Sequence, residues 1–219
     1  MTHQRYLLDI ETQQDLFQCG YIARDTGPII ENIYRLFDWV RGNQVPVIST
    51  VLRVRAFERG PFGCQPHCVE GTEGEAKLPG TILASRINLG LRNSTDLPAD
   101  LFSHYQQAVF EKRDTDIFKH TRLERLVTEL GSATFIICGA GIGQGIVQAA
   151  VGLRSRGMGV ILARDAVMEF EDPLAPMAWL RMEAKGVIFA STADIIGPRK
   201  TLRKAPFKAA QKVGQTSGR

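Results

Sequence analysis

Residues 133–156 read A-T-F-I-I-C-G-A-G-I-G-Q-G-I-V-Q-A-A-V-G-L-R-S-R, and this stretch decides the fold. Its first part, 133–138, is mostly apolar and predicts a buried strand. The glycine-rich run 139–145 predicts a tight turn, because glycine adopts backbone conformations that other residues avoid. Residues 144–156 predict a helix, whose inward face carries Ile146, Val147, Ala150 and Leu153. A strand, a turn and a helix in this order are typical of α/β proteins.

The alternation of strand and helix continues on both sides of this unit. Short apolar or β-branched runs predict six strands, at 5–10, 46–52, 108–111, 133–138, 159–163 and 186–191. Helical spacing predicts helices at 28–40, 121–130, 144–156 and 174–184. Strands separated by helices form mostly parallel sheets, because each crossover lays a helix on a face of the sheet. We therefore expect an α/β fold, a three-layer α/β/α sandwich of Rossmann type around a mostly parallel six-stranded sheet.

The charge is concentrated at the C-terminus. The 219 residues carry a net charge of +4, but the stretch from Arg199 onward holds seven basic residues and no acid. The rest of the chain then has 20 basic against 23 acidic residues. We expect one domain over 1–197 and a basic, flexible tail over 198–219. Nucleic-acid binding is not expected of the body, and only the tail could make weak contact with nucleic acid.

The remaining composition favours a soluble protein. No run of 18 apolar residues is present, so no membrane span is expected. The polar N-terminus lacks the order of a secretory signal. Four cysteines in 219 residues are too few for a disulfide scaffold, so we expect a reducing, cytoplasmic location.

One long segment differs from the rest. Residues 53–97 hold six glycines and three prolines with little periodicity. Loops of this length are usually functional or mobile, and we expect this one to fold over the strand ends. Ligands of parallel α/β sheets bind at the carboxyl ends of the strands. That rule directs attention to Asp9, Lys112 and the glycine run 139–145.

Four motifs around these positions resemble motifs of one known protein family. L-L-D-I-E, with Asp9, looks like an L-x-D-x-Q pattern. Residues 66–79, P-H-C-V-E-G-T-E-G-E-A-K-L-P, are similar to H-C-x-x-G-T-x-G, and 112–123, K-R-D-T-D-I-F-K-H-T-R-L, to K-x-x-x-S-A-F-x-x-T-x-L. Residues 135–166 fit a strand, a catalytic turn and a helix that lead to D-A. In this order the motifs resemble the isochorismatase-like, or cysteine hydrolase, superfamily over 6–197. It includes nicotinamidases, N-carbamoyl amide hydrolases and true isochorismatases.

The resemblance implies a catalytic set of Asp9, Lys112 and position 145. The family places a cysteine nucleophile at the start of the helix, where the helix dipole favours a thiolate. Here that position is Gly145, so no thioester can form, and Cys138 lies in an apolar strand. True isochorismatases also have glycine there and cleave a vinyl ether with the aspartate as general acid. Their turn carries a histidine where this chain has Gly143.

Two functions follow from this resemblance. The first is a hydrolase of a small metabolite that works without a cysteine nucleophile, with Asp9 as acid/base supported by Lys112. A proton on Asp9 would need burial or a negative neighbour such as Glu11, because Lys112 alone lowers the pKa of Asp9. The second is a non-catalytic pseudoenzyme that binds a ligand or a partner protein. The expected partners are a small-molecule substrate or ligand and further copies of the chain, as a dimer or tetramer.

The substrate is expected to meet residues beside the catalytic set. Arg53, near a strand end, would face an anionic group or only solvent. The other expected substrate-binding residues come from the strand ends, the turn and the neighbouring motifs: Glu11, Phe17, Phe118, Gly141 and Ile142.

No metal or cofactor is expected. Zinc-binding relatives use Asp-x-His after the second strand, where this chain reads T-V-L-R-V-R. Cys64, His67 and Cys68 resemble one corner of a metal site, but a structural zinc needs four ligands. The glycine run fails the G-x-G-x-x-G spacing for a dinucleotide, because Gln144 and Ile146 stand where glycine is required.

Overall fold

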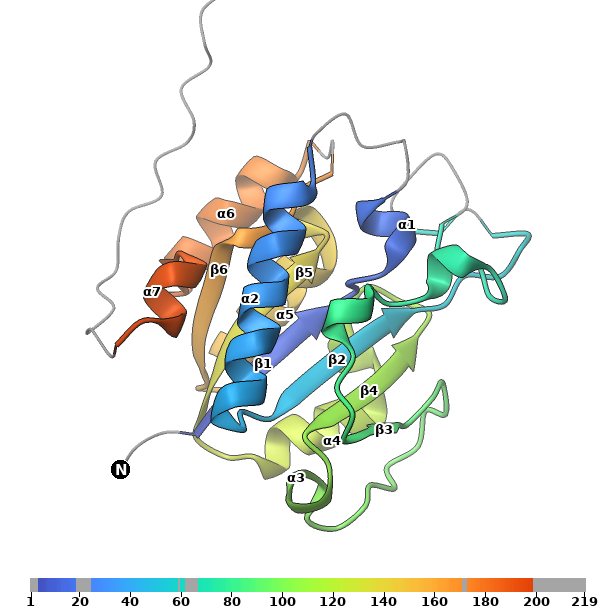
Figure 1. The fold of residues 1–219 in the computed structure, drawn as a ribbon, viewed down its shortest axis with the longest axis horizontal. Helices are drawn as coiled ribbons and strands as arrows, with labels where there is room; N and C mark the ends of the chain where they lie inside the picture. Colours follow the sequence, from blue (N-terminus) through green and yellow to red (C-terminus); the bar gives the residue numbers. More distant parts are fainter. Residues whose placement is uncertain (1–3, 19–24, 59, 62–66, 171–172, 199–219) are drawn as a thin grey trace, which may run out of the picture.

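A computed structural model describes residues 4–18, 25–58, 60–61, 67–170 and 173–198 (Figure 1). Its centre is a parallel sheet of seven strands in the order β3-β4-β2-β1-β5-β6-β7. The strands are β1 (Gln4–Ile10), β2 (Val47–Leu52), β3 (Arg86–Asn88), β4 (Gln107–Lys112), β5 (Ala133–Ala140), β6 (Gly159–Met168) and β7 (Ile188–Ala190). The predicted α/β architecture is confirmed, with one strand more than the six expected.

Helices cover both faces of the sheet (Figure 1). One face packs against α1 (Gln14–Phe17), α2 (Gly27–Asn43) and α7 (Thr192–Ile196). The other packs against α3 (Leu101–His104), α4 (Thr121–Glu129), α5 (Val147–Ser155) and α6 (Ala175–Ala184). The two buried clusters account for the strand sequences, because a parallel strand covered on both faces is apolar throughout. Val47–Leu52 is buried at every residue.

The extra strand is β3, which lies inside the segment 53–97 that was expected to be a loop. It has only three residues, is partly exposed, and pairs in parallel with β4 at the edge of the sheet. Such a short edge strand has no apolar run to reveal it. The same segment contains the 3-10 helices Glu73–Glu75 and Pro79–Thr81.

The glycine-rich turn also differs in detail from its prediction. A π-helix, Ile142–Ile146, starts two residues before the helix expected at Gln144 and continues into α5. π-Helical turns occur frequently at functional sites.

Three further expectations concern membrane-spanning helices, the C-terminal tail and the domain boundary. None of the helices in the described ranges is long and apolar enough to cross a membrane. The expected basic tail falls outside the described residues except for Pro198. The domain boundary at 197 remains a prediction.

Candidate active site

The strand order places the site at the centre of the sheet. β1 lies between β2 and β5, and the chain runs from β2 to the edge strand β3 and back to β4 before it crosses to β5. Open α/β sheets bind ligands where the strand order reverses, outside the carboxyl ends of the strands. Glu11 follows β1 at this point, and Lys112 ends β4. Gly145 lies in the turn that follows β5.

Lys112 and Glu11 form a buried ion pair. The Lys112 Nζ contacts Glu11 Oε1, and their side chains are 4% and 0% exposed. The same ammonium donates to the carbonyl of Asp114 at 2.7 Å and to that of Thr115 at 3.2 Å. Three oxygen acceptors therefore fix the direction of the Lys112 side chain. A buried ion pair is stable only with such additional hydrogen bonds.

The second carboxylate oxygen of Glu11 is in a different situation. Glu11 Oε2 is buried and has no hydrogen-bond partner within the described part of the chain. Burial raises the pKa of Glu11, and the positive charge of Lys112 opposes that rise. A carboxyl group in such a place exchanges its proton closer to neutral pH than an exposed one. Glu11 thus has the environment of a general acid or base.

Gly145 faces this pair. A Cβ at Gly145 would lie 3.6 Å from Glu11 Oε1 and 3.3 Å from the carbonyl oxygen of Thr115. Its backbone is not in the left-handed region, so the conformation does not itself require glycine. A side chain at position 145 would therefore start beside the Glu11–Lys112 pair.

Two other glycines of the turn, Gly139 and Gly141, are required by the backbone. Gly139 has φ of +122°, and a Cβ there would lie 1.8 Å from the carbonyl oxygen of Ile10. Gly141 has φ of +84° and donates its N–H to the Met168 carbonyl at 3.0 Å. These glycines bring the turn close to the end of β1, where Glu11 begins.

Asp9 has a different partner from the one expected. The sequence suggested that Lys112 supports Asp9, whereas Asp9 Oδ2 accepts from Lys77 Nζ at 2.6 Å and from Ser49 Oγ at 2.7 Å. The strand register explains this arrangement. Asp9 pairs with Ser49, which pairs with Val109, so Lys112 lies three residues further along β4. Three residues of strand span about 10 Å, which takes Lys112 past Asp9 to Glu11.

Two residues of the site could have been found from a different alignment. The D-x-Q pattern also fits Glu11-Thr12-Gln13, with glutamate in place of aspartate. The Gln13 amide donates to the Leu52 carbonyl at 2.9 Å and accepts from the Leu52 N–H at 2.7 Å. Gln13 thus fastens the chain after Glu11 to the end of β2. No pattern in the sequence singled out Lys77.

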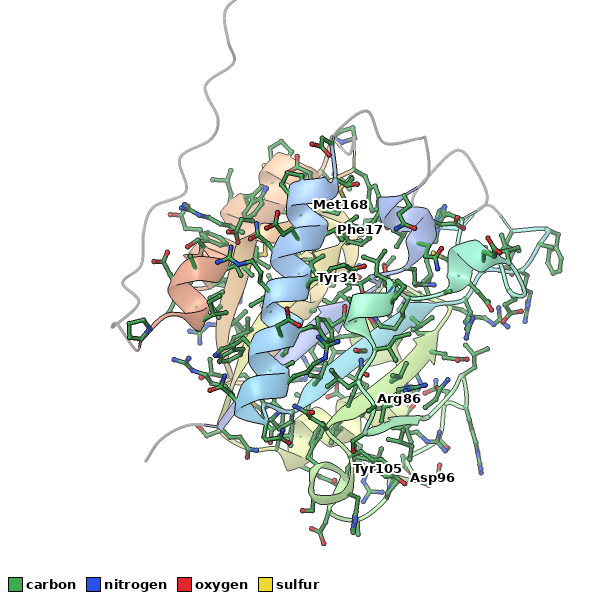
Figure 2. The ribbon with its side chains drawn as sticks, viewed as in Figure 1. Phe17, Tyr34, Arg86, Asp96, Tyr105 and Met168 are labelled. Atoms are coloured by element: carbon green, nitrogen blue, oxygen red, sulfur yellow. The ribbon has the colours of Figure 1, made fainter. Side chains whose placement is uncertain are left out.

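The remaining candidates are dispersed. Phe17 is buried in the same apolar cluster as Met168, on the α2 face of the sheet, and both are labelled in Figure 2. Phe118 stacks under the guanidinium of Arg156, 3.8 Å from its ring centroid, and lies against Gly152 of α5. Ile142 is a buried core residue of the turn.

Arg53 is held by two carboxylates. It contacts Glu75 and binds Glu111 at 2.7 Å, with its side chain 19% exposed. Both bonds tie the long loop and β4 together at the strand ends. An anionic ligand at Arg53 would have to compete with both carboxylates.

The cysteines and possible metal ligands among the described residues form no further centre. The described residues contain no cluster of histidine, cysteine, aspartate and glutamate that could hold a metal ion. Cys64 lies outside the described residues, and Cys68 is buried. Cys138 is buried in β5, where burial raises the pKa of its thiol well above the usual range. A thiol in that state is a poor nucleophile.

The family comparison places a known domain over part of the chain. Residues 95–194 match the model of the isochorismatase domain. No curated protein matches the sequence.

Solved structures match most of the chain at low identity. N-carbamoylsarcosine amidase from Thermoplasma acidophilum is 15% identical with a TM-score of 0.64, covering 89% of this chain and 99% of that one. A nicotinamidase/pyrazinamidase from Bacillus subtilis is 19% identical with a TM-score of 0.63, covering 86% and 100%. An isochorismatase family protein from Desulfovibrio vulgaris is 20% identical with a TM-score of 0.65, covering 89% and 97%. The resemblance of this chain to the isochorismatase-like family is thus confirmed, by the domain match over 95–194 and by a fold that it shares with these proteins.

Proposed function

We propose that the protein is a hydrolase of a small metabolite that works without a cysteine nucleophile, with Glu11 as the acid/base and Lys112 as its electrostatic partner. The observation that carries this proposal is the buried Glu11–Lys112 contact beside Gly145. It gives Glu11 the role that the sequence motif suggested for Asp9, because Lys112 and position 145 both face Glu11.

The proposed step is a proton transfer at Glu11 Oε2, the carboxylate oxygen that Lys112 does not bind. As an acid, Oε2 first gives its proton to the substrate. As a base, it then takes a proton from the water whose oxygen bonds to the substrate, so that hydrolysis leaves the enzyme unchanged. Lys112 stays charged and keeps the other oxygen in place. Such transfers contribute about 10²- to 10⁴-fold to a rate.

The absence of a side chain at position 145 leaves the nucleophile to the solvent. Water bound beside Glu11 replaces the cysteine of the thiol-dependent relatives. This favours bonds that need no strong nucleophile, such as a vinyl ether, in which the acid protonates a vinyl carbon and water then adds to the resulting cation. Amides, which are poorer substrates for that route, are the second class to test.

The test is a hydrolysis panel of isochorismate, nicotinamide and N-carbamoyl compounds, with thermal-shift binding read on the same samples. Wild type is compared with Glu11→Gln and Asp9→Asn. We expect turnover of at least one compound, lost by 100-fold or more in Glu11→Gln and reduced far less in Asp9→Asn. Glu129→Gln, which changes an exposed carboxylate, is the matched control.

The outcomes separate the alternatives. Full activity in Glu11→Gln with loss in Asp9→Asn would return the acid/base role to Asp9. Binding of a compound without turnover would favour the non-catalytic relative. Neither binding nor turnover would direct attention to a partner protein.

We also propose that the chain assembles into a dimer or tetramer in the cytoplasm. Exposed apolar side chains at the start and along α6 support an assembly: Leu174, Met177 and Leu180 are 62%, 56% and 52% exposed. They recur every three residues, so they share one side of the helix. Light scattering during gel filtration measures the mass, and a Leu180→Glu variant that stays at the wild-type mass would exclude this face.

A further inference from the structure

A second buried ion pair lies next to the proposed catalytic pair and has no task in the reaction. Lys77 Nζ is 2.6 Å from Asp9 Oδ2, and their side chains are 7% and 0% exposed. Burying two charges costs desolvation energy, and apolar residues of similar size often serve stability as well or better. Stability alone is therefore a weak explanation for this pair.

Lys77 holds the chain on both sides of Glu11. Besides Asp9, two residues before Glu11, it donates to Thr12 Oγ1 at 2.7 Å, one residue after Glu11. The Thr12 hydroxyl in turn donates a hydrogen bond to Thr81 Oγ1 at 3.0 Å. The ammonium thus joins the end of β1 to the loop that contains Lys77 and Thr81.

Backbone hydrogen bonds run beside this contact. The Leu78 N–H donates to the Thr12 carbonyl at 2.8 Å, and the Gln14 N–H donates to the Ala76 carbonyl at 2.8 Å. Gln13 and Lys77 form an antiparallel bridge between the two segments. The chain just after Glu11 is therefore paired with the chain around Lys77.

Glu11 needs such support. Its φ of +54° lies in the left-handed region, which is strained for a residue other than glycine. Conformations of this kind persist only where the surroundings impose them. The contacts of Lys77 with Asp9 and Thr12 impose it from both sides.

We propose that Lys77 is a positioning residue for Glu11: by binding Asp9 and Thr12 it holds the Glu11 carboxylate against Lys112 and adds a second positive charge beside it. The purpose of this role rests on the proposed function, whereas the contacts of Lys77 with Asp9 and Thr12 do not depend on it. The charged groups that act on Glu11 are Lys112 on β4, Asp114 just after β4, and Lys77 on the loop.

The test is a side-chain ¹³C NMR titration of the Glu11 carboxyl, assigned with Glu11→Gln. In Lys77→Met we expect the pKa of Glu11 to rise by about one unit, a tenfold increase in proton affinity. Lys77→Arg keeps the charge and should restore most of the wild-type value. Lys119→Met removes an exposed lysine paired with Asp114 and is the matched control, with no comparable shift expected.

A second variant covers the case in which Lys77→Met fails to fold, since it leaves Asp9 buried without its partner. Asp9→Leu/Lys77→Met removes both charges, and the pKa of Glu11 should again lie above the wild-type value. An unchanged Glu11 titration in a folded variant of either kind overturns the proposal. Because the titration needs no substrate, a protein that hydrolyses nothing but shows the shift would defeat the proposed function and leave the positioning role intact.

Discussion

The ammonium of Lys112, at the end of β4, contacts the carboxylate of Glu11, which follows the end of β1. Strand β2 lies between the two, so the contact bridges three neighbouring strands at their carboxyl ends. Neither side chain is more than 4% exposed. The pair therefore links the packing of the sheet to the electrostatics of the site, and changes at either residue should affect both.

Lys112→Met is expected to destabilise the fold by about 3–5 kcal/mol at neutral pH, because it leaves the Glu11 carboxylate buried without its counter-charge. It also leaves the carbonyls of Asp114 and Thr115 without their common donor. Urea unfolding measures the loss. Lys119→Met, at an exposed ion pair, should cost far less, because solvent screens that pair. Equal losses in the two variants would contradict a buried pair at Lys112.

The raised pKa of Glu11 predicts a particular pH dependence of stability. Above its ordinary value of 4.5, the folded protein holds a proton on Glu11 that the unfolded chain releases. The contribution of Glu11 to the free energy of unfolding therefore falls as pH rises through this window, by about 1.4 kcal/mol per unit of pKa difference.

The measurement is the difference in unfolding free energy between wild type and Glu11→Gln from pH 4 to 8. The stability of wild type relative to Glu11→Gln should fall as pH rises. Glu129→Gln gives the background from an exposed carboxylate. If the stability of wild type relative to Glu11→Gln rises over the same range, the charge of Lys112 has a larger effect on the pKa of Glu11 than burial has.

Gly145→Ala tests the space beside Glu11. The added Cβ would meet the Thr115 carbonyl at 3.3 Å and Glu11 Oε1 at 3.6 Å, so the fold should tolerate it with a loss under about 1.5 kcal/mol. Turnover should fall at least tenfold, because the methyl group occupies the position from which water would attack. Kinetics and thermal unfolding are measured together. Gly42→Ala, in α2 with nothing within 4 Å, is the control and should stabilise slightly. Unchanged turnover in Gly145→Ala would exclude this approach.

The sequence predicted the elements whose patterns are local. The apolar run 133–138 and the helical spacing in 121–130 arise from burial on the two faces of the sheet, so both appeared in the structure close to their expected bounds. β3 was missed because its three residues owe their conformation to pairing with β4.

The site was predicted less completely, because its pairings depend on register. Asp9 and Glu11 are two residues apart, so either could have been the carboxylate beside Lys112. The register of β1, β2 and β4 places Glu11, not Asp9, beside Lys112. No single motif contains that register. Lys77 comes from a loop 68 residues away from Asp9 in the sequence, which a local pattern cannot relate.

Gly139→Ala is expected to disrupt the scaffold of the site. Its Cβ would lie 1.8 Å from the carbonyl oxygen of Ile10, a backbone atom that cannot move without shifting Glu11, and its φ of +122° excludes other residues. We expect a loss above about 3 kcal/mol, or no soluble fold. Gly131→Ala also has a positive φ but nothing within 4 Å, so it should cost only about 1–2 kcal/mol. Urea unfolding of both variants separates the cost of the backbone conformation from that of the close approach. If both lose the same free energy, the contact between Gly139 and Ile10 does not constrain the chain, and the turn does not fix the position of Glu11.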